Sequence, residues 1–376
     1  MKFLQSSLSI DGNWSDLPGS LEPLEASLVF AFGQRAPISH DRTFDAVRER
    51  FPSARLVFVS TAGNFADTHV DDEKITCTAV LFERATTVFA SEHLDSQAEL
   101  SQVCHRLAAA LARPDLKHVL IFSDGSIVNG TTLSKAFNEA LPEGVTLSGG
   151  LAGDGTDFVR TLVGLDAPPA PGVIVAVGLC GPSLRVGFGS SGGWVPFGPK
   201  RTVTASRDNV LQELDGKLAL ELYKTYLGPE ADALPASALR FPLHVTPLGE
   251  SYPFVRTILS IDEKEGTMTF AGDIPLDSTV QLMRASYEDL IAGAEQAAEA
   301  ASQEAEFVLA VSCVGRRIVL GQRVEEELEG IRGSFPESSV ITGFYSYGEL
   351  APSGHERKCQ LHNQTMTITS ISESGE

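Results

Sequence analysis

The chain has 376 residues, of which 43% are apolar, and its 34 glycines and 20 prolines are typical of a globular protein rich in strands and turns. Its length suggests two or three domains of ~100–200 residues each. The net charge of −20 argues against binding to nucleic acid or to an anionic membrane surface, because both require basic patches and none is visible in the sequence.

Several features of the sequence predict a cytoplasmic location. The N-terminus has no sustained apolar run, so it is not expected to be a secretory signal. No stretch approaches the ~18–20 apolar residues that span a bilayer. The five cysteines lie far apart without a Cys-x-x-Cys pair, which argues against a disulfide framework and a cysteine zinc site. No histidine or acidic spacing typical of metal sites occurs either, so no metal is expected.

Three segments repeat one plan, in which an apolar strand, a helix and a second strand follow one another. Their connectors are short, which implies parallel strand pairs with right-handed crossovers. Before them, residues 1–24 are punctuated by glycine and proline and are expected to form an irregular lead-in. The predicted units are strand 27–33, helix 42–51 and strand 55–63; strand 118–125, helix 131–141 and strand 145–155; and strand 307–315, helix 322–334 and strand 340–350.

Two further patterns bear on domain organisation. The tetrapeptide Phe-Val-Arg-Thr begins at residue 158 and again at residue 254, in stretches that alternate like antiparallel strands. Residues 192–207 are dense in glycine and proline and are predicted to be a linker. Together the patterns predict an α/β fold, mixed in α and β, with two related domains at 25–205 and 206–372 whose mixed sheets contain the strand–helix–strand units.

The glycine-rich stretch 149–155, Gly-Gly-Leu-Ala-Gly-Asp-Gly, could be read as a phosphate-binding loop. It lacks the Lys-Ser/Thr ending of a P-loop, and the residues after it alternate like a strand instead of opening a helix. Asp154-Gly155 suits a type I′ turn, so a β-hairpin is predicted here.

Residues 340–350 deliver a cluster of polar and aromatic side chains after a buried strand. Tyr345, Tyr347 and Glu349 lie at i, i+2 and i+4, so in one continuous strand they would point to the same face. That face could form an aromatic wall with a carboxylate acceptor for an ammonium group. The alternative is a half-buried sheet face on which Glu349 forms a salt bridge with Arg357.

Neighbouring segments add further candidate residues. Arg316 could hold a ligand carboxylate bidentately while Cys313 lines the pocket, although a buried cysteine and solvent-reaching arginines would fit equally well. His362 could be an axial haem or metal ligand, or a hydrogen-bonded structural residue, and Asn363 follows it. Arg160 would reach the same hollow from the N-terminal half.

Several motifs occur in an order and spacing typical of one protein family. They are STAGNF at 60–65, GGLAGDG at 149–155, RFPLHV at 240–245, AGDIPLDSTVQLM at 271–283, SCVGRR at 312–317, GFYSYGEL at 343–350 and HNQT at 362–365. This set resembles the FIST family of sensory domains, in which a GFY-x-YGE strand and a later HNQT strand are the most recognisable features. One departure is that Leu276 and Asp277 replace the family's usual glycine, which leaves the shape of that turn open.

The resemblance implies an intracellular, non-catalytic module that binds a small ligand and signals to a partner, often a kinase or cyclase. Amino acids are proposed ligands in the family. Some stand-alone members are described as haem proteins that respond to nitric oxide through a histidine kinase. No cofactor is certain for this chain, and haem is the one candidate that the resemblance adds.

We therefore expect a cytoplasmic sensor that acts through a separate partner such as a histidine kinase, with its ligand at the carboxyl ends of the parallel strands or between the domains. Two alternatives stay open. One is a haem-binding sensor that responds to nitric oxide; the other is an enzyme of unrecognised type, against which stands the lack of a recognisable acid–base pair or activated nucleophile. The predicted ligand-binding residues are Arg160, Cys313, Arg316, Tyr345, Tyr347, Glu349, His362 and Asn363.

Overall fold

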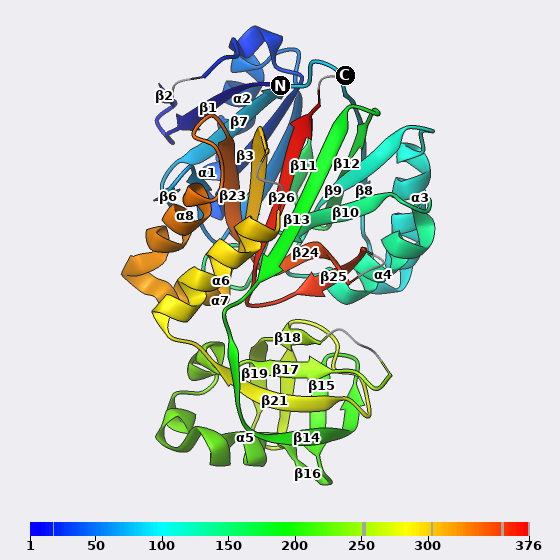
Figure 1. The fold of residues 1–376 in the computed structure, drawn as a ribbon, viewed down its shortest axis with the longest axis vertical. Coiled ribbons are helices and arrows are strands. Elements are labelled where there is room, and N and C mark those ends of the chain that lie inside the picture. Colours follow the sequence, from blue (N-terminus) through cyan, green and yellow to red (C-terminus); the bar gives the residue numbers. More distant parts are fainter. Residues whose placement is uncertain (18, 250–252, 302–303, 355–356, 375–376) are drawn as a thin grey trace.

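The computed structural model describes residues 1–376 except 18, 250–252, 302–303, 355–356 and 375–376. The chain folds into an upper body, which contains both termini, and a smaller lower lobe (Figure 1). Mixed sheets flanked by helices make up the upper body, so the predicted α/β class is confirmed. Among the described residues, no helix combines the length and the apolar character needed to cross a membrane.

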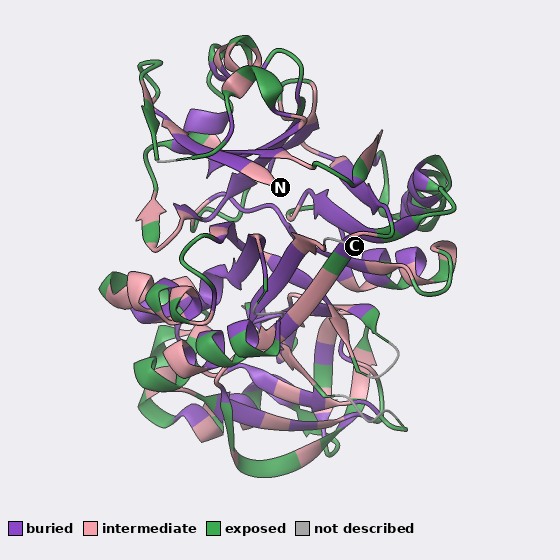
Figure 2. Cartoon of the chain, turned by 45° about the horizontal axis from the view of Figure 1, so that its top comes forward, coloured by how far each residue is buried: buried purple, intermediate pink, exposed green. Residues whose placement is uncertain are grey.

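All three predicted strand–helix–strand units are present, each with a parallel pair of strands. These strands are buried almost throughout, as expected for parallel strands covered on both faces. Figure 2 shows that the surrounding helices combine buried and exposed residues. The units are β3 (Leu28–Gln34), α2 (Thr43–Arg50) and β4 (Arg55–Thr61); β9 (Leu116–Ser123), α4 (Gly130–Ala140) and β10 (Thr146–Leu151); and β22 (Phe307–Cys313), α8 (Val324–Gly333) and β23 (Val340–Ser346).

Each unit belongs to a different six-stranded sheet of the upper body. In every sheet the parallel pair has an antiparallel strand on either side, so the three sheets follow one plan. The first sheet adds β1 (Lys2–Leu8), β2 (Trp14–Asp16), β7 (Ile75–Leu81) and β11 (Val163–Leu165); the second adds β8 (Thr86–His93), β12 (Val173–Cys180), β24 (Gly348–Ser353) and β25 (Lys358–His362); the third adds β5 (Asn64–Ala66), β6 (His69–Asp71), β13 (Leu184–Ser191) and β26 (Met366–Glu373).

The three sheets exchange strands in a closed cycle. After the first unit the chain adds β5 to the third sheet, after the third unit it adds β24 to the second sheet, and after the second unit it adds β11 to the first. Each exchanged strand pairs with backbone N–H and C=O groups that would otherwise be open at a sheet edge. Strands from both sides of the predicted boundary at residues 205 and 206 consequently share sheets, because edge pairing joins segments that are distant in sequence.

The lower lobe is inserted between β13 and the helix α6 (Tyr287–Ala300). Most of the predicted linker 192–207 forms strand β14 instead, and its antiparallel partner β21 returns the chain to the upper body. Pro199 is compatible with this strand because the pairing is irregular between Phe197 and Arg201. The lobe contains β14 (Val195–Arg207), β15 (Val210–Leu214), β16 (Lys217–Leu218), α5 (Ala219–Leu227), β17 (Leu243–Thr246), β18 (Phe254–Arg256), β19 (Ile258–Asp262), β20 (Thr267–Phe270) and β21 (Thr279–Arg284).

A buried ion pair lies where the lower lobe joins the upper body. The guanidinium of Arg316, on α7 (Val314–Leu320), donates to Glu327 Oε2 at 2.8 Å, and neither side chain has exposed surface. It also donates to the carbonyl oxygens of Gly192 and Leu290, at 2.7 and 2.8 Å. Because Gly192 precedes β14 and Leu290 lies on α6, after β21, one side chain holds both segments that connect the lobe to the body.

Replacing Glu327 with leucine would leave the Arg316 cation buried without a counter-charge. We expect the free energy of unfolding to fall by about 3–5 kcal/mol. Urea unfolding followed by circular dichroism measures this change. The control is Glu329→Gln, at an exposed position of the same helix, which should alter the free energy by less than about 0.5 kcal/mol. Equal stability of the two variants would contradict the importance of the ion pair.

Candidate ligand-binding site

A pocket of about 290 Å³ lies between the upper body and the lower lobe. The upper body contributes residues at or beyond the carboxyl ends of the parallel strands β9, β10, β22 and β23, which is where ligands bind in open α/β sheets. The lower lobe supplies the opposite wall. The lining includes loop 125–129, Phe158 and Val314 from the upper body, and Leu239, Thr257 and Phe270 from the lower lobe.

Three of the eight predicted residues line this pocket. Cys313 ends β22, Tyr347 lies at the bend between β23 and β24, and Asn363 follows β25. The tertiary structure thus brings together three segments of the C-terminal half. The predicted residues that lie outside the pocket lining are Arg160, Arg316, Tyr345, Glu349 and His362.

The predicted common face of Tyr345, Tyr347 and Glu349 is wrong, because the three residues do not share one strand. β23 and β24 belong to different sheets, and the chain bends at Tyr347 between them. Tyr345 consequently lies in the core, where its hydroxyl donates to Glu327 Oε1 at 2.8 Å. Only Tyr347 of the two tyrosines reaches the pocket.

Glu349 is fully buried behind the pocket. Its carboxylate accepts hydrogen bonds from Ser346 Oγ at 2.8 Å and from the backbone N–H and hydroxyl of Thr365 at 3.2 and 3.0 Å. Burial raises the pKa of Glu349 to about 8, even though these hydrogen bonds and the charge of Arg316 act in the opposite direction. The alternative salt bridge to Arg357 is also wrong, because Arg357 is exposed while Glu349 has no exposed surface.

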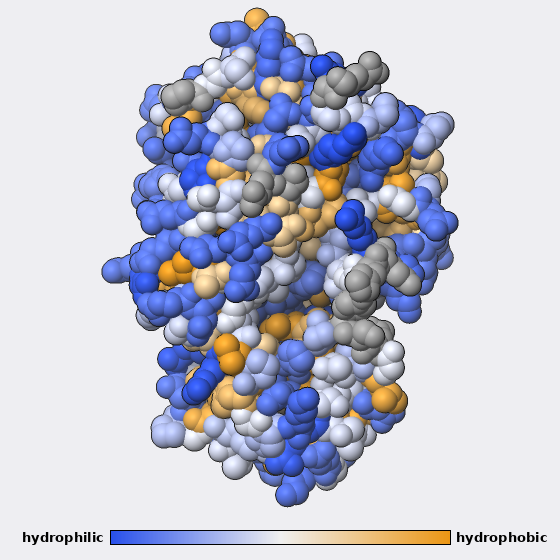
Figure 3. Space-filling view, in the orientation of Figure 1, coloured by the Kyte–Doolittle hydropathy of each residue, from blue (hydrophilic) through white to orange (hydrophobic). Residues whose placement is uncertain are grey.

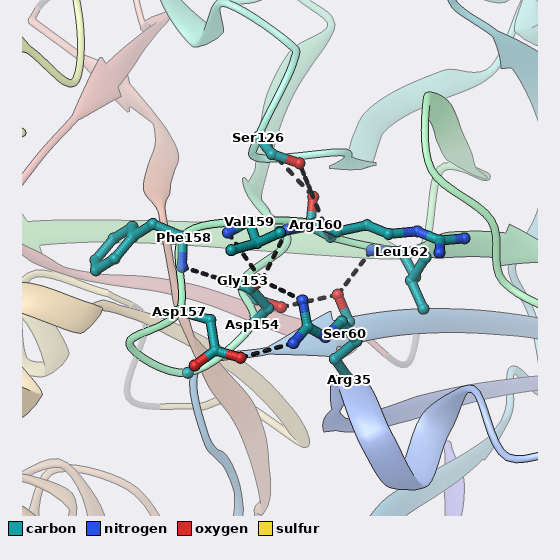
Figure 4. Close-up of polar contacts among 12 residues, drawn as sticks. Arg35, Ser60, Ser126, Gly153, Asp154, Asp157, Phe158, Val159, Arg160 and Leu162 are labelled. Carbon is teal, nitrogen blue, oxygen red and sulfur yellow. Dashed lines mark hydrogen bonds and ion pairs between the residues drawn. The ribbon is translucent and has the colours of Figure 1, made fainter.

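Neither predicted arginine lines the pocket. The guanidinium of Arg316 neither faces a ligand nor reaches solvent, since it is fully buried against Glu327. The side chain of Arg160 is exposed, and its backbone N–H donates to Asp154 Oδ2 at 2.8 Å (Figure 4). A ligand carboxylate would therefore meet no arginine among the described residues of the pocket wall.

His362 lies on β25, outside the pocket lining. Its Nε2 is 3.3 Å from the carbonyl oxygen of Ala351, and its Nδ1 is 3.5 Å from Ser190 Oγ. Burial lowers the pKa of His362 to about 4, so the imidazole is neutral at pH 7. The described part of the chain also contains no cluster of three or more His, Cys, Asp or Glu side chains placed to hold a metal. Because both ring nitrogens already face protein groups, His362 does not fit the role of an axial haem ligand.

Asp154, predicted only as part of a hairpin turn, organises one wall of the pocket. Its carboxylate accepts hydrogen bonds from the backbone N–H groups of residues 158–160, at 2.8 to 3.1 Å, and forms an ion pair with Arg35 at 2.9 Å (Figure 4). The hydroxyl of Tyr347 also donates to it. The predicted hairpin is wrong because these bonds hold the segment as a loop until β11 begins.

This loop brings Phe158 to the pocket. Its backbone has a φ of 53°, a left-handed conformation that costs an L-residue roughly 1–2 kcal/mol. The ring stacks on that of Tyr347, with 4.6 Å between the ring centroids. Ser60 secures the loop on both sides, since its Oγ accepts from the N–H of Leu162 and donates to the carbonyl oxygen of Gly153, each at 2.8 Å (Figure 4).

A second buried carboxylate, Asp124, shapes the wall formed by residues 125–129. It accepts hydrogen bonds from two backbone N–H groups of this loop, from that of Gly172, and from the hydroxyls of Ser126 and Thr161. Two of these partners, Thr161 and Gly172, lie more than 30 positions further along the chain, so local sequence pattern does not predict them.

Two buried polar atoms in the pocket wall have no hydrogen-bond partner among the described residues. They are Asn363 Oδ1 in the upper body and Thr257 Oγ1 in the lower lobe. Asn363 is 1% exposed and Thr257 is 4% exposed. Buried polar groups are nearly always hydrogen-bonded, so an unpartnered polar atom in a residue of each wall is an exception.

The neutral state of His362 makes stability depend on pH. Its pKa is about 4 in the folded protein and roughly 6.5 in an unfolded chain. Between these values only the unfolded chain binds the proton, so stability falls as the pH decreases through this range. His362→Gln removes the effect and should reduce the loss by at most about 1.4 kcal/mol per pH unit.

Urea unfolding at about pH 7, 5.5 and 4 measures the contribution of His362. The control is His105→Gln, at an exposed position on α3 (Leu100–Leu111), which should keep the pH dependence of the wild type. If His362→Gln also keeps that dependence, the imidazole is not held neutral by burial.

A search of solved structures finds weak matches that include two cyanuric acid hydrolases. One, from A. caulinodans, is 10% identical with a TM-score of 0.34, and the match covers 100% of this chain and 99% of that one. The other, described as an evolutionary innovation by structural concatenation, is 10% identical with a TM-score of 0.29 and full coverage of both chains. At such TM-scores the likeness carries no argument about activity.

A comparison with curated protein sequences finds no match. Family profiles, in contrast, cover most of the chain: residues 27–217 match the FIST N domain and residues 219–352 match the FIST C domain. FIST domains are associated with sensory and signal-transduction roles and with the binding of small ligands. The chain belongs to the FIST family.

Proposed function

We propose that this protein is an intracellular sensor in which a small molecule binds the pocket and alters the position of the lower lobe. The observation that carries the proposal is that both parts of the molecule supply walls of one pocket, each with an unpartnered polar atom. A ligand that contacts both walls favours the arrangement in which they are correctly spaced. Membership of the FIST family supports the same function.

Polar contacts beside the pocket join the lower lobe to the upper body. Arg256 of the lower lobe donates to the carbonyl oxygen of Leu361 at 3.1 Å, and Asn129 Nδ2 donates to Asp273 Oδ1 at 3.2 Å. Asn129 is itself part of the pocket wall, and Asp273 directly follows the lining residue Gly272. Movement of these residues on ligand binding would therefore change the contacts that hold the lobe.

A separate signalling protein, such as a histidine kinase, would detect this change. On the face shown in Figure 3, hydrophobic side chains of the described residues lie in small groups instead of one broad patch, which suits a transient contact with a partner. The five cysteines are free and buried, which suits a reducing cytoplasm. A direct test is whether the protein changes the autophosphorylation rate of a candidate kinase only when its ligand is present.

The pocket favours a sensor over an enzyme. Cys313 is the one cysteine that lines it, and burial raises the pKa of this thiol. A protonated thiol is a poor nucleophile at pH 7. A haem sensor is disfavoured by the surroundings of His362 described above.

Leu239→Trp should fill part of the pocket from the lower lobe and abolish ligand binding. The control is Leu248→Trp, which adds the same ring at an exposed site of the same lobe. Mass spectrometry of molecules released by denaturing the purified protein identifies the ligand. Adding it back at about 100 times its Kd should stabilise the wild type and the control by about 2.7 kcal/mol. If Leu239→Trp carries the same molecule with the same stabilisation, the ligand binds elsewhere.

A further inference from the structure

Among the residues that the structure describes, the pocket wall contains no charged side chain, although 21% of the residues in this chain are charged. The 20 described lining residues are of uncharged types or are weak acids. The two weak acids are Cys313 and Tyr347, and burial raises the pKa of both, so they are neutral at pH 7. An ion placed here would lose part of its hydration without meeting an opposite charge among the described lining residues, which is unfavourable.

The charged side chains near the pocket form hydrogen bonds to other groups of the protein. Asp124 and Asp154 are buried behind the wall and accept hydrogen bonds from the loops that form it. Asp273 accepts a hydrogen bond from Asn129, and Arg256 donates to backbone carbonyl oxygens. At the N-terminus of α4, the side chain of Asn129 accepts a hydrogen bond from the backbone N–H of Thr132, so this N–H group is not free to bind an anion.

Asn363 Oδ1 and Thr257 Oγ1, the two unpartnered atoms, indicate which hydrogen-bonding groups a ligand could supply. Asn363 Nδ2 donates to the carbonyl oxygen of His362 at 3.0 Å, which leaves Oδ1 as an acceptor without a donor. The hydroxyl of Thr257, in the lower lobe, can donate or accept a hydrogen bond and also has no partner among the described residues. A ligand with an N–H group would supply the missing donor to Asn363.

The described wall also provides apolar surface, beside the uncharged polar side chains of Gln97, Asn129 and Asn209. Phe158, Phe270 and Tyr347 contribute aromatic surface, and Val128 and Leu239 contribute aliphatic surface. A ring or short apolar chain would fit such a wall, while its polar end meets Asn363 and Thr257.

We infer that the pocket takes an uncharged small molecule with an N–H donor and an apolar ring or chain, a carboxamide for example, in preference to a free amino acid or an organic anion. This inference rests on the proposed function and specifies its ligand class. It departs from the amino-acid ligands that the family resemblance implies, because an amino acid carries both an ammonium and a carboxylate group at pH 7.

The test compares molecules of matched shape and different charge. Isothermal titration calorimetry of the full chain with benzamide, benzoate and phenylalanine should show that benzamide binds at least about ten-fold more tightly than the other two. Asn363→Leu should weaken benzamide binding about ten-fold, since it removes the acceptor at similar volume. Thr257→Val is a second variant of nearly unchanged shape, and its loss of affinity should be in the same direction.

A variant that adds a positive charge tests whether the uncharged lining is the reason that benzamide binds more tightly than benzoate. Leu259→Arg places a cation at the pocket lining on a residue that is 47% exposed, so it should tighten benzoate binding about ten-fold without aiding benzamide. Tighter binding of benzoate or phenylalanine than of benzamide to the wild type would overturn the ligand class while leaving the pocket as the binding site. Absence of binding by all three probes, together with purified protein that releases no small molecule, would overturn both the ligand class and the proposed function.

Discussion

The buried pair of Arg316 and Glu327 is the interaction on which the arrangement of the two parts depends. Removing both charges from water is costly, and the cost is offset only when every group is well paired. Here the guanidinium also holds two backbone carbonyl oxygens at the base of the lower lobe. The carboxylate in turn accepts from the hydroxyls of Tyr345 and Ser312, at 2.8 and 3.3 Å. The pair therefore joins α7, α8, two strands of the third sheet and the two chain segments that lead into and out of the lower lobe.

The side chains that hold the pocket loops in place are different from the side chains that line the cavity. Two buried carboxylates, Asp124 and Asp154, hold its loops by accepting backbone N–H groups, and neither lines the cavity. The described lining combines apolar surface with uncharged polar side chains, among them Asn209, Thr257 and Asn363. The described wall comes from both parts of the molecule, which is the feature on which the proposed sensor function depends.

Local pattern was enough to predict the three strand–helix–strand units, because the period of apolar residues and the position of glycines act over a few neighbouring residues. Three of the eight predicted ligand-binding residues, Cys313, Tyr347 and Asn363, lie in the pocket. The shared face of Tyr345, Tyr347 and Glu349 was wrong because spacing within a strand says nothing about a bend between two sheets. The roles of the two aspartates were missed because each combines nearby backbone N–H groups with partners that are distant in sequence, such as Thr161 and Gly172 for Asp124 and Arg35 for Asp154.

The sequence by itself determined the family, the α/β class and the segments that form the parallel pairs, since each depends on motifs or on contacts between near neighbours. Only the tertiary structure decided how the sheets exchange β5, β11 and β24, and which side chains face the pocket. Edge pairing and burial bring together residues that are hundreds of positions apart, and their free energies depend on the whole fold. For that reason Arg316 and Glu349, which were predicted to contact a ligand, are instead buried in the core, and the described lining of the pocket is uncharged.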